Sequence, residues 1–291
     1  MVWYDDPYAK FRRAGEYLHA VYFGIDDFLK GQPNGVVTKL DDDGWARGRM
    51  RIFDEPPEDL ALLVGDFVQN LRASLDHSVY ALATRKTERT EFPVHLDQLQ
   101  YTGLLRPDDP KSSARELALA FVPDEYRAII DATQPYNRGN MKAARQDPLA
   151  ILAWLSNVDK HRLIHPGFHR QHGPPRITIK EGRLSGIRVR RDIPLNQEVR
   201  DGTVVSAWRP KLGKELDVDV DVYVEFTVAF SERAFDYVQL EAVWNYVGRV
   251  INTLRAVSEG RDVTFDPTWP MPSPWPKGRP AAHKSRLISN E

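Results

Sequence analysis

The sequence Gly65-Asp-Phe-Val-Gln-Asn-Leu-Arg-Ala-Ser-Leu-Asp-His77 lies inside the most regular helical pattern of the chain, which runs over residues 59–84. Apolar side chains recur there every three or four residues. At about 100° per residue they fall within about 120° of one another. These side chains are Phe67, Leu71, Leu75, Val79 and Leu82. Such a stripe predicts a long amphipathic helix that packs against a core.

Further helices are expected on both sides of this segment. Asp5–Lys30 carries a second apolar stripe, and shorter helical patterns cover residues 112–121, 123–133 and 148–163. Each of the shorter patterns begins near Ser or Pro, which suit a helix start. Between the first two long helices, Val36–Phe53 predicts a β-hairpin with its turn at residues 41–44, which read Asp-Asp-Asp-Gly.

Residues 216–228 read Leu-Asp-Val-Asp-Val-Asp-Val-Tyr-Val-Glu-Phe-Thr-Val, which predicts one unbroken strand with an apolar and a polar face. Arg176–Lys180 and Gly186–Arg191 are its expected neighbours in the sheet. A closing helix is expected over residues 235–258, where apolar residues again follow a helical spacing; they are Val238, Ala242, Val243, Tyr246, Val250 and Leu254.

We therefore predict an α+β fold, a helical bundle with an antiparallel β-sheet inserted before the last long helix. It is expected to form a single domain over residues 1–260, helical over 1–165 apart from the small hairpin near 36–53, and β-rich over 176–230. Residues 261–291 are rich in proline, which excludes a regular element. They predict an extended tail, and its Trp269 and Trp275 are candidates for docking a protein partner.

The composition restricts the class of protein. With 291 residues, 42% hydrophobic and 28% charged, and a net charge of −1, the chain is expected to be an ordinary soluble protein. It has no cysteine, which excludes disulfides, a thiolate nucleophile and cysteine-bound metals. It shows no apolar run for a membrane span, no signal peptide, and none of the G-x-G-x-x-G, P-loop or G-x-S-x-G motifs. A cytoplasmic protein without a cofactor is expected.

The helix predicted over residues 59–84 also presents polar side chains. Asp66, Asn70 and His77 share one side of it, and Arg72 and Asp76, four residues apart, are expected to pair. Polar groups on a helix that packs on a core indicate that another helix or chain faces them. One interpretation is a polar network that holds two helices in register.

Arg72-Ala-Ser-Leu-Asp-His77 fits the pattern R-x4-H and resembles the signature of HEPN proteins, helical domains that often dimerise and cut RNA without a metal. The resemblance implies that His77 moves the proton of the 2′-hydroxyl or the leaving oxygen, while Arg72 holds the phosphate. Asn70 and Asp76 would orient these two catalytic residues. It also implies an endoribonuclease that acts as a homodimer on RNA without a cofactor.

A second polar cluster, Asn157-Val-Asp-Lys-His-Arg-Leu-Ile-His165, lies at the end of the helix predicted over residues 148–163. Its cations Lys160, His161 and Arg162 lie where the helix dipole favours positive charge. With Asp159, they form either a phosphate-binding cluster that supports the site and faces His77, or a solvated helix end. Together with Asn70-Leu-Arg and Asp76-His upstream, the cluster resembles uncharacterised bacterial and phage proteins.

Two other functions remain open. A non-enzymatic protein-interaction protein would use the polar helix pair structurally and bind its partner through the Trp/Pro tail. A metal-binding protein would use four closely spaced histidines, His161, His165, His169 and His172. Because Pro166 disfavours helical geometry at residue 165, we expect loop histidines that bind no metal.

Residues 160–191 contain nine lysines and arginines against one acid, Glu181, which is a candidate footprint for nucleic acid. The competing interpretation is ion pairing within the sheet. In it, Arg188 and Arg190 pair with acids on the strand predicted beside them, Asp217, Asp219 and Asp221.

Overall fold

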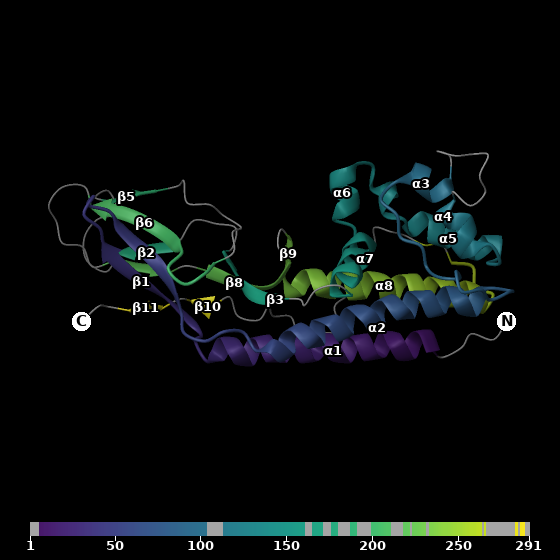
Figure 1. The fold of residues 1–291 in the computed structure, drawn as a ribbon, viewed down its shortest axis with the longest axis horizontal. Coiled ribbons are helices and arrows are strands. Elements are labelled where there is room, and N and C mark those ends of the chain that lie inside the picture. Colours follow the sequence, from purple (N-terminus) through teal and green to yellow (C-terminus); the bar gives the residue numbers. More distant parts are fainter. Residues whose placement is uncertain are drawn as a thin grey trace. The chain divides into compact units, whose positions relative to one another are not determined.

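A computed structural model of the chain (Figure 1) describes residues 6–103, 113–160, 165–170, 176–179, 187–190, 199–210, 218–221, 223–230, 233–263, 265, 283–284 and 286–288. The chain has an α+β fold, as predicted. It forms two compact units, each assembled from segments that are distant in the sequence. Residues 1–20, 62–164 and 238–277 form a helical unit, and residues 21–61, 165–237 and 278–291 form a unit that contains the sheets. That residues 1–260 act as one domain stays a prediction.

The three long predicted helices are confirmed as α1 (Asp6–Lys30), α2 (Glu58–Leu82) and α8 (Tyr237–Ser258). The shorter ones are confirmed as α4 (Ala114–Leu119), α5 (Asp124–Thr133) and α7 (Pro148–Asp159). Three further short elements were not predicted, α3 (Gln98–Thr102), the 3-10 helix η2 (Pro135–Arg138) and α6 (Met141–Arg145). Among the described helices, none has an apolar stretch that could cross a lipid bilayer.

The apolar stripe of α2 lies in the core of the helical unit, as predicted. Phe67, Leu71, Leu75 and Val79 are 0% exposed. On α8 the stripe is only partly correct, because Val238 is 40% exposed and Ala242 also faces outward. Leu240, Val247 and Ile251 are buried there in addition to the predicted residues.

Helices α1 and α8 pack closely within the helical unit because a glycine lies on each side of the contact. A Cβ at Gly248 would lie 2.7 Å from Cζ of Phe11, and one at Gly15 would lie 3.3 Å from the indole nitrogen of Trp244. The rings of Phe11 and Trp244 stack with centroids 4.8 Å apart. The two glycines thus let aromatic rings fill the space between the helices.

The predicted hairpin is confirmed as β1 (Asn34–Leu40) and β2 (Ala46–Ile52), which pair antiparallel around Gly44 at φ +76°. It belongs to a five-stranded sheet with the order β11-β1-β2-β6-β5. In this sheet β6 is Val204–Pro210, β5 is Ile187–Val189 and β11 is Arg286–Ile288. Strand β11 runs parallel to β1, so this sheet is mixed.

The predicted strand over residues 216–228 is wrong in one respect, because its described part is divided between two sheets. Strand β7 (Val218–Asp221) pairs with β4 (Arg176–Ile179). Strand β8 (Tyr223–Phe230) pairs with β3 (His165–Arg170), β9 (Arg233–Phe235) and β10 (His283–Lys284). Alternation fixes which residues share a face, but it does not specify the partner of each half.

Two further predictions about the sheets are wrong. Strand β5 pairs with β6, so Arg188 lies opposite Arg209 and not opposite an aspartate; in β4, Arg176 lies opposite Asp221. The segment that contains His165 and His169 forms strand β3, where loop histidines were expected. The prediction that residues 261–291 contain no regular element is also wrong, because the described end of the tail, which follows its last proline, forms the short strands β10 and β11. Asp217, Trp269 and Trp275 lie outside the described residues.

Candidate functional site

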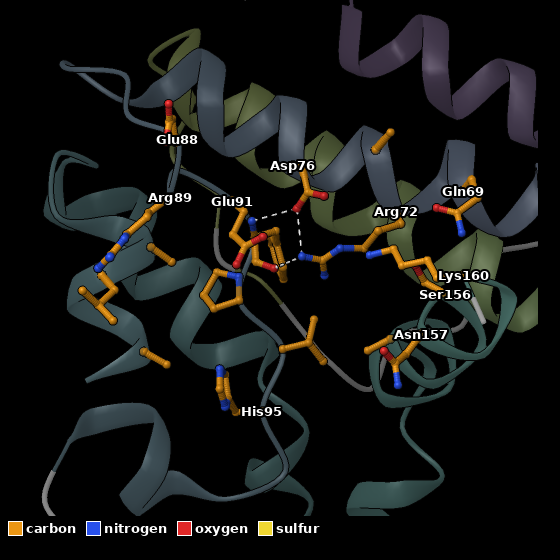
Figure 2. A pocket seen from close by; sticks show the side chains of 18 residues that line it. Gln69, Arg72, Asp76, Glu88, Arg89, Glu91, His95, Ser156, Asn157 and Lys160 are labelled. Carbon is orange, nitrogen blue, oxygen red and sulfur yellow. Dashed lines mark hydrogen bonds and ion pairs between the residues drawn. The ribbon is translucent and has the colours of Figure 1, made fainter. Parts of the chain in front are cut away.

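The helical unit contains a polar cleft of about 710 Å³ between α2, the loop over residues 88–95, α4 and α7 (Figure 2). We call it the α2–α7 cleft. It brings together polar side chains from both motifs of the sequence analysis and from the loop between them. These are Gln69, Arg72, Asp76, Glu88, Arg89, Glu91, His95, Ser156, Asn157 and Lys160.

Arg72 and Asp76 form the predicted pair and fasten the loop to α2. Nη2 of Arg72 lies 2.9 Å from Oδ1 of Asp76 and donates to the carbonyl oxygen of Phe92 at 2.6 Å. The amide of Phe92 donates to Oδ1 of Asp76 at 2.9 Å. The ion pair of Arg72 and Asp76 therefore binds both the amide and the carbonyl group of Phe92. This is a structural role for Arg72 and Asp76.

The two sequence motifs meet in space where α7 crosses α2. A Cβ at Gly65 would lie 2.6 Å from Oδ1 of Asp159, so a glycine lets the carboxylate approach the helix backbone. Oδ2 of Asp159 accepts a hydrogen bond from the Gln69 amide at 2.8 Å. Asp159 thus joins the two helices and does not line the cleft wall formed by its neighbours Asn157 and Lys160.

Lys160 is the exposed cation at the end of α7. In the part of the chain that the structure describes, no carboxylate lies within ion-pair distance of its ammonium group. Figure 2 shows Lys160 beside Arg72, Ser156 and Asn157 on one side of the cleft, with Glu88, Arg89 and Glu91 on the other. Its predicted companions His161 and Arg162 lie outside the described residues.

His77 lies apart from Arg72. It is exposed and lines a second cavity of about 490 Å³ together with Asp6, Tyr80, Lys86 and others. Five residues along a helix turn the side chain by about 140°, so the two motif residues point into different cavities. Asp76 alone lines both. Asn70 donates its amide to the carbonyl oxygen of Asp66 at 2.8 Å, one turn back on the same helix.

His95 is one of the cleft residues that the sequence analysis missed, together with Gln69, Glu88, Arg89, Glu91 and Ser156. Its ring centroid lies 5.6 Å from that of the fully buried Tyr101. Burial lowers the pKa of the His95 imidazole, against a smaller opposing effect of the Asp97 carboxylate, so the ring is neutral at pH 7. A histidine two residues after Pro93, in a loop without periodicity, offers no sequence signal beyond its type.

Among the described residues no group of three or more histidine, aspartate or glutamate side chains converges to hold a metal. The described side chains do not include those of the four histidines named above for a metal site. The metal-binding alternative therefore stays a hypothesis.

Comparisons with known proteins add no relative: no family model, no curated protein and no solved structure matches this chain. The resemblance to HEPN proteins thus rests on the motif at residues 72–77.

Proposed function

We propose that the protein binds single-stranded RNA in the α2–α7 cleft, with Lys160 and Arg72 holding phosphates. The observation that carries this proposal is an exposed lysine without an ion-pair partner in the described residues, beside a half-buried arginine in one polar cleft. Cations placed in this way are what a phosphate needs for binding.

Arg72 retains hydrogen-bonding capacity for this role. Its Nη2 is engaged with Asp76 and Phe92, but Nε and Nη1 donate to no group within the described ranges. A guanidinium has five N–H donors, so Arg72 can fix the loop and still contact a phosphate oxygen. The ion pair with Asp76 also lowers the net charge that Arg72 offers to the ligand.

The acidic side of the cleft limits the number of phosphates that bind. Glu88 and Glu91 repel phosphate there, and Arg89 offsets only one of the two charges. We therefore expect two phosphate contacts, at Lys160 and Arg72, with the ribose or base towards the acidic side. For single strands, two contacts correspond to a slope of about −1.4 in a plot of log K against log salt.

The resemblance to HEPN proteins extends the proposal to metal-independent cleavage of the bound RNA by a homodimer. The second resemblance, to uncharacterised bacterial and phage proteins, adds a bacterial or phage origin, and the proposed location is the cytoplasm. A phosphate held by Arg72 is not in the same cavity as His77 of the same copy. Cleavage that uses Arg72 and His77 at one phosphate would need Arg72 from one copy and His77 from the other, as the resemblance implies.

The test is binding of a fluorescein-labelled, mixed-sequence RNA, followed by anisotropy in EDTA at 50–200 mM salt. We expect the affinity of the wild type to fall about sevenfold over this range. Lys160→Ala should bind about three- to tenfold more weakly at 50 mM salt and reduce the slope to about −0.7. The matched control is Lys142→Ala, because Lys142 is an exposed lysine on α6 that does not line the cleft.

Equal affinity and slope for the Lys160→Ala variant and the wild type would contradict the proposal. So would the absence of RNA binding at 50 mM salt.

The second candidate is a protein-interaction protein, which the Arg72–Asp76–Phe92 contacts favour because they show the polar pair used to hold a loop. It predicts that Arg72→Met lowers stability while no labelled RNA binds to the wild type.

A further inference from the structure

The segment Phe92–His95 is held at both ends by polar contacts. At one end, Arg72 and Asp76 bind the carbonyl and amide groups of Phe92. At the other end, the buried Gln134 donates to the carbonyl oxygen of Pro93 at 2.8 Å and accepts from the amide of His95 at 3.0 Å. The backbone that carries the His95 side chain is therefore rigid, which is what a functional group in a site requires.

The imidazole itself has no hydrogen-bond partner among the side chains and backbone that the structure describes. The ring is tilted by 43° against the Tyr101 ring. The side chain lines the α2–α7 cleft with Arg72 and Lys160 (Figure 2). Four hydrogen bonds thus fix the segment, while the two ring nitrogens remain available to a ligand.

Charged groups of both signs face the cleft, and they come from α2, the loop and the end of α7. They are Arg72 and Asp76 on α2, Glu88, Arg89 and Glu91 in the loop, and Lys160 at the end of α7. Of the charges near the ring, the Asp97 carboxylate raises the pKa of His95, and burial lowers it more. A neutral imidazole with a pKa below its ordinary value can accept a proton at pH 7.

We propose that His95, and not His77, is the group that removes the 2′-hydroxyl proton in metal-independent cleavage of RNA held in the α2–α7 cleft. This inference rests on the proposed function, because RNA must bind there first. It assigns proton transfer to a residue outside the R-x4-H motif.

The reaction is a transesterification within the RNA. A ring nitrogen of His95 takes the proton of the 2′-hydroxyl, whose oxygen attacks the adjacent phosphorus as the bond from phosphorus to the 5′-oxygen breaks. The leaving 5′-oxygen takes a proton from water, and the resulting hydroxide takes the proton from the His95 imidazolium. The products are a 2′,3′-cyclic phosphate and a 5′-hydroxyl, and Lys160 and Arg72 stabilise the extra negative charge on the phosphoryl oxygens.

The test is cleavage of end-labelled RNA in EDTA by the wild type, His95→Ala and His77→Ala, with RNA affinity measured for each protein. We expect His95→Ala to lower the cleavage rate by about 10²- to 10⁴-fold while its affinity changes less than about threefold. Lys142→Ala, an exposed lysine outside the cleft, is the control and should stay within about threefold of the wild type in both. His77→Ala separates the two assignments, because the resemblance implies that it loses cleavage and the assignment to His95 implies that it keeps cleavage. Added imidazole should restore part of the rate to His95→Ala, which no merely structural role explains.

A 2′-deoxy substitution at the cleaved nucleotide should abolish cleavage and leave binding intact. His95→Gln serves as a second variant, since the backbone amide of residue 95 still donates to Oε1 of Gln134 in either substitution.

Three results would overturn the assignment to His95. The first is cleavage by His95→Ala at the wild-type rate, the second is loss of cleavage in His77→Ala alone, and the third is a wild type that binds RNA without cutting it. In this third case the proposed RNA binding stands, while the proposed cleavage and its assignment to His95 both fall. A wild type that does not bind RNA contradicts the proposed function itself.

Discussion

Replacing Asp76 by alanine tests how the cleft is built. In the wild type the Asp76 carboxylate accepts the Phe92 amide at 2.9 Å and pairs with Arg72 at 2.9 Å. A hydrogen bond to a charged group contributes about 1.5–3 kcal/mol, and an exposed ion pair adds about 0–1 kcal/mol. The side chains of Arg72 and Asp76 are 18% and 30% exposed, so water screens both interactions in part. We expect Asp76→Ala to lower the free energy of unfolding by about 2–3 kcal/mol.

The measurement is urea unfolding followed by far-UV circular dichroism, with hydrogen exchange of the Phe92 amide as a local probe. The matched control is Asp66→Ala, an exposed aspartate on the same helix. Alanine raises the helix propensity at either position by about 0.5–0.7 kcal/mol, and the Asp66→Ala control measures this gain without the loss of the Phe92 contact. Asp76→Asn keeps a neutral acceptor for the amide and should lose only about 1 kcal/mol.

The reasoning is refuted if Asp76→Ala costs no more than Asp66→Ala. Unchanged protection of the Phe92 amide in the Asp76→Ala variant would refute it as well, because that amide would then have another partner.

Three further predictions concern other parts of the helical unit. Arg138→Met should cost about 2–4 kcal/mol in urea unfolding at pH 7, because it leaves the Asp147 carboxylate, 0% exposed and 2.6 Å from the guanidinium, buried without its cation. Gly65→Ala should lower stability in the same assay, instead of adding the roughly 1 kcal/mol expected in a helix. Its Cβ would lie 2.6 Å from Oδ1 of Asp159 and would displace the carboxylate that accepts the hydrogen bond from Gln69. Burial lowers the pKa of His95 in the folded state below its ordinary value of 6.5. The stabilisation by the neutral imidazole is therefore present above pH 6.5 and is lost as the pH falls through 6.5 towards the folded-state pKa. Thermal unfolding between pH 5 and 8 should therefore depend less on pH in His95→Gln, and an unchanged pH dependence would contradict this.

The long helices could be predicted because their signal is local. A stripe such as Phe67, Leu71 and Leu75 repeats with the helical period, and the same residues are buried in the structure. The pairing of Arg72 with Asp76 follows from the same geometry, since residues four apart are neighbours on a helix surface. The separation of Arg72 from His77 also follows from it, because an interval of five residues turns by about 140°.

Local periodicity thus accounts for the helices, the hairpin and the faces of the strands, since each depends on residues a few positions apart. Other features depend on segments that are far apart in the chain. They are the pairing partners of β7 and β8, the contact of Asp159 with Gly65, and the position of His95 in the cleft. No pattern within one segment specifies such contacts, because they follow from the packing of whole elements against one another. His95 faces the cleft because Asp76 on α2 and Gln134, which directly follows α5, hold its loop there.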